Sequence, residues 1–167
     1  KQIKLSFKNN EVNECDYLII SDGIFSKCKS LISNKQTKPK YNDTLAIRGI
    51  LTKSFKKIDN KNISLFLGSN FHQVIYPTNA HGDLNFISIL KYHLSVEEQK
   101  NYSLFDNNSF IEKVLEKIPP RDKELINSLK ELKIFPVFIS DNFYKIKTNN
   151  IHLIGDAFFT FPPSFAQ

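Results

Sequence analysis

The sequence predicts an α+β fold, in which a mainly antiparallel sheet is accompanied by helices. Four short apolar segments between residues 44 and 90 are separated by Lys/Asn-rich or Gly-containing turns, a spacing typical of neighbouring antiparallel strands. Beyond them, apolar residues recur at helical period behind sequences with capping-box spacing. The 167 residues, 41% of them hydrophobic, suffice for one sizeable core or for parts of two.

The first 43 residues predict a hairpin, a buried strand and a crossing segment. Ile3 to Phe7 alternates apolar and polar residues and leads into an Asn-Asn turn, as a strand entering a hairpin does. Tyr17 to Ile20 is a continuous apolar run that ends in Ser21-Asp22-Gly23, which is typical of a buried parallel strand with a turn at its carboxyl end. The Lys-, Asn- and Pro-containing stretch from Asn34 to Asp43 predicts a crossing between subdomains.

The central sheet is expected to contain four strands and to be followed by two helices. The strands are predicted at Thr44 to Leu51, Ile63 to Leu67, Gln73 to Tyr76 and Leu84 to Leu90. Capping-box spacing occurs at Ser95 with Glu98 and at Ser109 with Glu112. The residues at helical period are Ile111, Val114, Leu115 and Ile118, and then Leu125, Ile126, Leu129 and Leu132. Two helices are therefore expected beside the sheet.

Composition argues against a nucleic-acid partner. The net charge of +6 comes almost entirely from lysine, with arginine only at positions 48 and 121. Phosphate recognition favours arginine, whose guanidinium group can make two parallel hydrogen bonds. The preference for lysine over arginine is therefore more typical of an AT-rich genome than of a phosphate-binding protein. The cluster of Lys53, Lys56, Lys57 and Lys61 contains no arginine and predicts a solvated loop. A basic, non-catalytic binding module stays as an alternative, and it predicts strongly salt-dependent association.

Cysteine usage and hydropathy predict a soluble, cytoplasmic protein without a metal site. Cys15 and Cys28 form no CxxC pair and have no histidine cluster near them, so reduced thiols are expected. No apolar run reaches the roughly 18 residues needed to span a bilayer, and the first residues alternate rather than forming a secretory core. The sequence has no Met and starts at Lys1 inside an apparent strand, so we expect both natural ends to lie outside it.

Two apolar runs end in acidic turns, and these are the most informative features of the sequence. The first is DYLIISDGIFSKCKSLI at 16–32, and the second is IHLIGDAFFTFPPSFAQ at 151–167. Loops beyond the carboxyl ends of parallel strands are where α/β sheets bind nucleotides, and an Asp there can accept a hydrogen bond from a ribose hydroxyl. Taken alone, each Asp-Gly or Gly-Asp pair indicates only a turn.

With their flanks, their order and their separation, the two segments resemble the DG and GD motifs of the FAD-dependent aromatic hydroxylases. This is the class A flavin monooxygenase group, which includes salicylate and ubiquinone-pathway hydroxylases. LAIRG at 45–49 and FHQVIYPTNAHGDLNFISIL at 71–90 resemble the sheet strands of that group. The resemblance therefore covers nearly the whole chain.

The resemblance implies which residues contact the cofactor. Asp156, after Gly155, corresponds to the aspartate that hydrogen-bonds the sugar-like part of FAD, and Pro163 to the loop proline beside the flavin ring. Asp22 and Gly23 correspond to the DG pair, which touches the FAD pyrophosphate region and is linked to the passage of NADH or NADPH.

Three positions depart from the motifs. Lys29 stands where the DG motif has arginine, so the charge is kept but the bidentate fork is lost. Phe158 and Phe159 replace the second Ala and the His that often follow Gly-Asp-Ala. We expect these two changes to repack the loop.

The resemblance also implies a domain organisation and a reaction. Residues 1–34 and 149–167 would be FAD-binding segments, and 35–148 a substrate-binding domain with an antiparallel sheet and helices. The GxGxxG fingerprint is absent, and in the family it lies upstream of the DG motif. The parent enzyme would use NAD(P)H, FAD and molecular oxygen to hydroxylate a small aromatic substrate, and the fragment would be inactive alone. The sequence leaves two alternatives: the protein could form a homodimer, and it could be a flavin-dependent epoxidase or reductase of the same fold.

Arg48 and His72 are the candidates for substrate chemistry. Arg48 either faces the flavin or an acidic substrate, or forms a surface salt bridge. His72 precedes Tyr76-Pro77 on a strand that faces the flavin in the family. An imidazole there can take the proton of a phenol, which raises the electron density of the ring. The alternative for His72 is a structural role.

Overall fold

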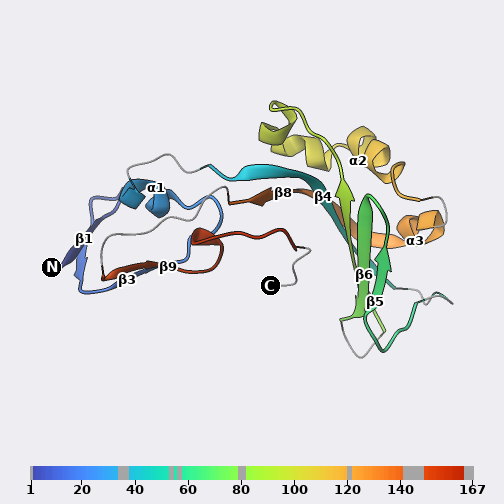
Figure 1. Cartoon of the computed structure of the whole chain (residues 1–167), viewed down its shortest axis with the longest axis horizontal. Coiled ribbons are helices and arrows are strands. Elements are labelled where there is room, and N and C mark those ends of the chain that lie inside the picture. Colours follow the sequence, from blue (N-terminus) through green and yellow to red (C-terminus); the bar gives the residue numbers. More distant parts are fainter. Residues whose placement is uncertain are drawn as a thin grey trace. The chain divides into compact units, whose positions relative to one another are not determined.

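The computed structural model describes residues 2–33, 38–52, 55, 58–78, 82–119, 122–140 and 149–163. The chain divides into two compact units (Figure 1), of which unit 1 comprises residues 1–42 and 138–167 and unit 2 comprises 43–137. Several expectations fall outside the described residues: the lysines at 53, 56 and 57, the start of the crossing segment at 34–37, and Ala166-Gln167 of the second motif. No described helix is both long enough and apolar enough to cross a bilayer.

A five-stranded sheet forms most of unit 2, with strand order β5-β6-β7-β4-β8. The strands are β4 (Lys40–Leu51), β5 (Ser64–Leu67), β6 (Phe71–Pro77), β7 (Leu84–Lys91) and β8 (Leu129–Ile139). The pairs β5–β6, β6–β7 and β4–β7 are all antiparallel. Together with the helices described next, this sheet confirms the predicted α+β class, and it has one strand more than expected.

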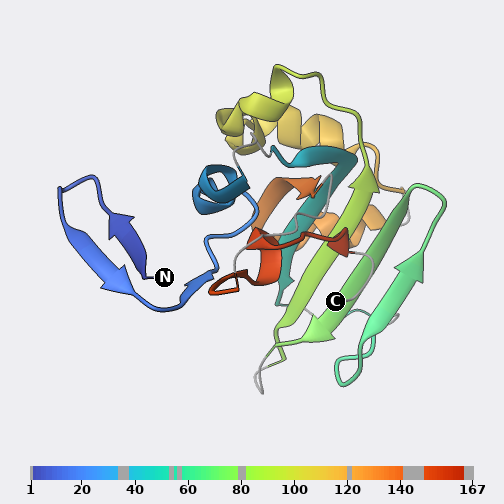
Figure 2. The same ribbon diagram turned by 60° about the vertical axis from the view of Figure 1, so that its left-hand side comes forward.

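One face of this sheet carries the core of unit 2, and we call it the covered face. Helices α2 (Asn108–Leu115) and α3 (Lys123–Asn127) lie along one side of the sheet in both views (Figures 1 and 2). A bond from Gln73 to Asp122, at the start of α3, joins that helix to the covered face. Seven apolar side chains of this face are at most 2% exposed: Leu45, Ile47, Leu51, Ile75, Leu84, Phe86 and Leu90.

The alternate residues of the same strands form the opposite face, which we call the bare face. Because successive strand residues point to opposite sides, every second position is directed away from α2 and α3. Most of these residues are half-buried, and Arg48 is exposed. The bare face consists of Ala46, Arg48, Ile50, His72, Val74, Tyr76, Asn85, Ile87 and Ile89 on the three central strands.

One of the two expected capping boxes forms and the other does not. The amide of Ser95 donates to Glu98 at 2.7 Å and the amide of Glu98 donates to the Ser95 hydroxyl at 3.2 Å, which confirms the first box. It opens two short 3-10 turns, η1 (Glu98–Lys100) and η2 (Tyr102–Asp106). The Ser109 box is wrong because Asn107, in extended conformation, accepts a bond from the amide of Phe110 and caps α2 two residues earlier.

The second expected helix is wrong beyond Asn127, because β8 starts at Leu129. Leu129 and Lys130 lie against Gly49, where an added Cβ would meet them at 3.1–3.2 Å, so β8 pairs closely with β4. Glu131 has a left-handed φ of 52°, which is incompatible with a continuing α-helix. Strand pairing has therefore overridden the local helical period.

Unit 1 contains a hairpin and a parallel strand pair. β1 (Ile3–Ser6) pairs antiparallel with β2 (Val12–Cys15), as the first alternating segment predicts. β3 (Leu18–Ile20) pairs in parallel with β9 (Ile151–Leu153), so the two apolar runs lie side by side. Helix α1 (Lys27–Ser33) follows β3, and the short turn η4 (Gly155–Ala157) follows β9.

The cap of α2 gives a first testable prediction. Asn107→Ala removes the acceptor for the Phe110 amide and should lower the free energy of unfolding by about 0.5–2 kcal/mol. Ser109→Ala is the matched control, because Ser109 is exposed within the helix and its change should be within about 0.5 kcal/mol. Urea titrations of both variants measure these differences. A loss for Ser109→Ala as large as that for Asn107→Ala would contradict the cap assignment.

Candidate functional site

The turn after β3 builds the start of helix α1. The Asp22 carboxylate accepts bonds from the amides of Lys27 at 3.1 Å and Cys28 at 3.3 Å. The Ser26 hydroxyl accepts a bond from the amide of Lys29 at 2.9 Å. The first amides of a helix have no partner within the helix, so these three bonds stabilise its beginning. The Asp-Gly-x-x-Ser spacing thus has a local structural reason.

The Asp22 carboxylate is therefore already engaged within unit 1. Burial by itself would raise the pKa of Asp22, but the hydrogen bonds with Ser26 and Cys28 outweigh it and hold the pKa below its usual value. Gly23 has a φ of 78°, a conformation that side-chain-bearing residues rarely adopt, although a Cβ there would meet no atom within 4 Å. The glycine is thus required by the backbone of the turn.

The turn after β9 has a similar backbone but leaves its acidic side chain exposed. Gly155 also has a left-handed φ, of 56°, and its carbonyl accepts bonds from the amides of Phe158 and Phe159. Asp156 is exposed. Its carboxylate accepts no hydrogen bond from the part of the chain that the structure describes, in contrast to that of Asp22. This carboxylate can accept hydrogen bonds from a ligand.

The two acidic turns lie at the same edge of the parallel pair. The amide of Leu18 donates to Asn150 at 2.9 Å, and the amide of Ile154 donates to Ile20 at 3.0 Å, so the pairing continues to the carboxyl ends of both strands. This edge is where parallel sheets bind nucleotides. Pro163, the proposed flavin-side proline, is exposed at the end of the last described segment.

Lys29 ties the two turns together. Its ammonium group donates to the Phe158 carbonyl at 2.9 Å, and the residue is only 6% exposed. Burial lowers the pKa of Lys29 below its usual value. Lys29, which stands where the DG motif has arginine, therefore donates its hydrogen bond to an acceptor within the protein. The ring centroids of Phe159 and Phe161 lie 4.7 Å apart, so one of the two aromatic replacements, Phe159, packs within the loop.

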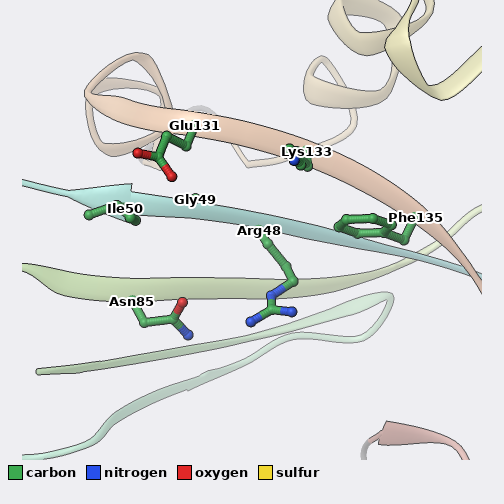
Figure 3. Close-up of a pocket in the computed structure, with 7 residues that line it drawn as sticks. All are labelled: Arg48, Gly49, Ile50, Asn85, Glu131, Lys133 and Phe135. Atoms are coloured by element: carbon green, nitrogen blue, oxygen red, sulfur yellow. The ribbon is translucent and has the colours of Figure 1, made fainter. Parts of the chain in front are cut away.

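Unit 2 presents Arg48 and His72 on the bare face, but not next to each other. Arg48 on β4 lies opposite Ile87, and His72 on β6 lies opposite Ile89, with β7 between them. Arg48 borders a hollow of about 300 Å³ (Figure 3), and His72 is not among its lining residues. Arg48 forms no ion pair with any residue in the described ranges. The lining consists of Arg48, Gly49, Ile50, Asn85, Glu131, Lys133 and Phe135.

Sequence reasoning missed four side chains of this hollow. Glu131, Lys133 and Phe135 belong to β8, a strand that the helical period of the segment concealed. Asn85 stands out in the sequence only as a polar residue within the apolar run LNFISIL. The register of β4 with β7, in which Asn85 lies opposite Ile50, is what brings it to the hollow.

Comparisons with known proteins identify the fold. No family model and no curated protein matches the sequence significantly. Klebsiella pneumoniae HpxO complexed with FAD and uric acid matches with a TM-score of 0.75 and 17% identity, over 99% of this chain and 42% of that one. A salicylate hydroxylase substrate complex matches with a TM-score of 0.73 and 20% identity, over 97% and 44%. For 2,6-dihydroxypyridine-3-hydroxylase from Arthrobacter nicotinovorans the TM-score is 0.70 and the identity 16%, over 97% and 47%.

These matches confirm the resemblance to FAD-dependent aromatic hydroxylases at the level of the fold. The chain spans less than half the length of each of these solved structures. Its fold is similar to that of one part of each of these proteins.

The Asp22 turn gives a prediction about pH. Because hydrogen bonds hold the Asp22 pKa below the unfolded value of about 3.9, the ionised group stabilises the folded state above that pH. This stabilisation is lost as the pH falls through the folded pKa. Asp22→Ala should therefore lower the free energy of unfolding by a constant amount at pH 6–7, and the difference from wild type should shrink below about pH 4.

Denaturant titrations at each pH measure this difference. Asp16→Ala serves as the control, because Asp16 is exposed and, among the described residues, its carboxylate accepts no hydrogen bond; its backbone carbonyl accepts one from Asn150. A deficit of Asp22→Ala that is the same at pH 3 as at pH 6 would mean that the carboxylate charge does not stabilise the turn.

Proposed function

We propose that this chain is part of an FAD-dependent monooxygenase that hydroxylates an aromatic substrate bearing a phenolic or carboxylate group. NADH or NADPH and molecular oxygen are the co-substrates. Bound FAD would supply the redox chemistry, and the protein supplies binding, orientation and exclusion of water. The observation that supports this most strongly is the β3–β9 edge, where the exposed Asp156 carboxylate stands in a fold shared with enzymes solved with FAD.

The residues at this edge fit a nucleotide cofactor in different ways. The Asp156 carboxylate would accept a hydrogen bond from a ribose or ribityl hydroxyl of FAD. Gly155 beside it leaves the backbone of the turn uncovered, and Pro163 would lie beside the flavin ring. Because the Asp22 carboxylate is engaged with α1, the contribution of Asp22 and Gly23 would come from the shape and backbone of their turn.

The bare face of unit 2 would hold the substrate. Its apolar side chains, such as Val74 and Ile87, offer a surface for an aromatic ring, and the exposed Arg48 offers a positive charge for an acidic group. His72 would accept the proton of a phenol and so raise the electron density of the ring before the oxygen atom is added. The paired acidic turns favour this function over a basic binding module, because a module that binds acidic partners does not require two acidic turns at the ends of neighbouring strands.

Replacing Asp156 tests the cofactor site. Asp156→Ala in the full-length gene product should raise the FAD dissociation constant by about 10- to 100-fold, because a hydrogen bond to a charged group is worth about 1.5–3 kcal/mol. Titration of the apoprotein with FAD measures it. Asp106→Ala, which removes an exposed carboxylate from unit 2, should leave the constant unchanged. Equal FAD affinity of Asp156→Ala and wild type would contradict the assignment of Asp156 as the acceptor for an FAD hydroxyl.

Replacing His72 tests the proposed base. His72→Asn should slow oxygen transfer by about 10²- to 10⁴-fold, because the substrate loses its general base. FAD binding should stay intact, because the base acts only after the flavin has been reduced. Reduced cofactor would then be consumed without product. The ratio of product formed to NAD(P)H consumed measures this coupling.

The matched control is His93→Asn, because the exposed His93 pairs with Asp43 and should not affect coupling. If His72→Asn keeps the wild-type coupling ratio and its pH dependence, His72 has a structural role and the proton leaves by another route.

A further inference from the structure

A second hollow lies at the carboxyl end of β7, within unit 2, and we call it the basic hollow. Its volume is about 560 Å³, and it shares no lining residue with the hollow that Arg48 borders. One side is formed by Lys91, the last residue of β7, and by Tyr92 and His93, which follow it. Asn70, just before β6, and two lysines at the end of α2 complete the polar lining.

Three lysines from two elements converge on the basic hollow. Lys91 ends β7, whereas Lys113 lies on α2 and Lys117 lies four residues further along, in the turn that follows α2. All three are exposed, and none forms an ion pair with a residue in the described ranges. Like charges four residues apart on a helix repel one another. An anion bound between these ammonium groups would offset that repulsion.

Two carboxylates lie close to the basic hollow, but neither lines it and both have partners. Asp43 lies 3.2 Å from Nδ1 of His93. Glu98 accepts a hydrogen bond from the amide of Ser95 at 2.7 Å. The hydrogen bonds with Ser95, and to a smaller extent the charge of Lys113, hold the pKa of Glu98 below its usual value. These carboxylates offset part of the positive charge from outside and leave the described lining without an acidic residue.

Hydrogen bonds and a ring contact hold the two sides of the basic hollow together. The amide of Lys91 donates to the carbonyl of Asn70 at 2.8 Å, and the amide of Tyr92 donates to the carbonyl of Asp43 at 2.9 Å. The Tyr92 ring packs edge-on against Phe110 of α2, with the ring centroids 5.8 Å apart. The elements that carry the lysines are thus in place without a ligand. A preformed site loses less conformational freedom on binding.

The number of ammonium groups indicates the charge of the ligand. A phosphate monoester carries a charge of about −1.5 to −2 near pH 7, so one such group does not neutralise three lysines. Two linked phosphate groups match them better. Lysine binds phosphate as a point charge, so such a site depends on the convergence of several lysines, which the composition of the chain does not reveal. The volume of the hollow is within the range of small-molecule sites.

We propose that the basic hollow binds a diphosphate group, either as free pyrophosphate or as part of a nucleoside diphosphate. Lys113 and Lys117 contact one phosphate from the end of α2, and Lys91 contacts the other from the end of β7. The side-chain amide of the exposed Asn70 donates to a phosphate oxygen. This site goes beyond the proposed function, because none of its residues is among those assigned to FAD or to the aromatic substrate.

Neutral substitutions separate a ligand role of the lysines from a structural role. Lys113→Gln and Lys117→Gln each remove one of two repelling charges, so without an anion the midpoint of unfolding should stay the same or rise. Lysines that support the fold would give a lower midpoint. Lys123→Gln is the matched control, because Lys123 is an exposed lysine on α3 that does not line the hollow. Lys113→Arg keeps the charge and should keep the binding.

The experiment measures dissociation constants of pyrophosphate, ADP and citrate for the full-length gene product at physiological salt with saturating FAD. Gln at position 91, 113 or 117 should weaken pyrophosphate binding by about two- to fivefold, as exposed ion pairs do. Lys123→Gln should leave the constant unchanged. Pyrophosphate should also raise the unfolding midpoint of the wild type, and raise that of the Lys113→Gln/Lys117→Gln double variant less. ADP that binds more tightly than pyrophosphate identifies a nucleotide as the ligand, and ADP that binds more weakly identifies free pyrophosphate.

Three results would overturn the site. They are no binding of pyrophosphate by the wild type at millimolar concentrations, an equal loss in Lys123→Gln and Lys113→Gln, and binding of citrate as tight as that of pyrophosphate. FAD binding and NAD(P)H consumption by the same protein test the proposed function separately. Lysine-dependent pyrophosphate binding by a protein that binds no flavin would leave this site standing and reject the monooxygenase.

Discussion

The antiparallel register of β4 with β7 is the constraint on which the rest of unit 2 depends. It pairs Leu45 with Leu90 and Leu51 with Leu84 on the covered face, all at most 2% exposed. Because side chains alternate, the same register fixes Arg48 on the opposite face. A slip of one residue would move Arg48 into the core and the leucines into solvent. The stability of the core therefore determines the position of the candidate site.

In unit 1, two turns with similar sequences serve different purposes. Each follows a strand of the β3–β9 pair and contains a glycine with left-handed φ. The Asp22 carboxylate is engaged by the first amides of α1, while Asp156 stays exposed. A residue of a sequence motif can thus be required for the local fold. The hydrogen bonds that it makes in the structure show whether it has that role or is free to bind a ligand. Lys29 is a further case, since its ammonium group bonds to the Phe158 carbonyl.

Local patterns in the sequence were sufficient for the central strands, the β3–β9 runs and the Ser95 capping box, because each is specified by neighbouring residues. They failed at β8, where the helical spacing of the leucines gave way to pairing with β4 across Gly49. That error concealed the β8 side chains of the hollow that Arg48 borders. Asn85 was missed for another reason: its place at that hollow follows from the register of β4 with β7.

The account depends on the β3–β9 edge holding FAD, and a crystal structure of the full-length gene product with FAD tests this directly. The account predicts a carboxylate oxygen of Asp156 within about 2.5–3.2 Å of a ribose or ribityl hydroxyl. It also predicts the Gly23 turn near the pyrophosphate and the Asp22 carboxylate still bonded to the start of α1. Flavin bound at another edge of the protein, or an Asp156 carboxylate still facing solvent with FAD in place, would contradict it.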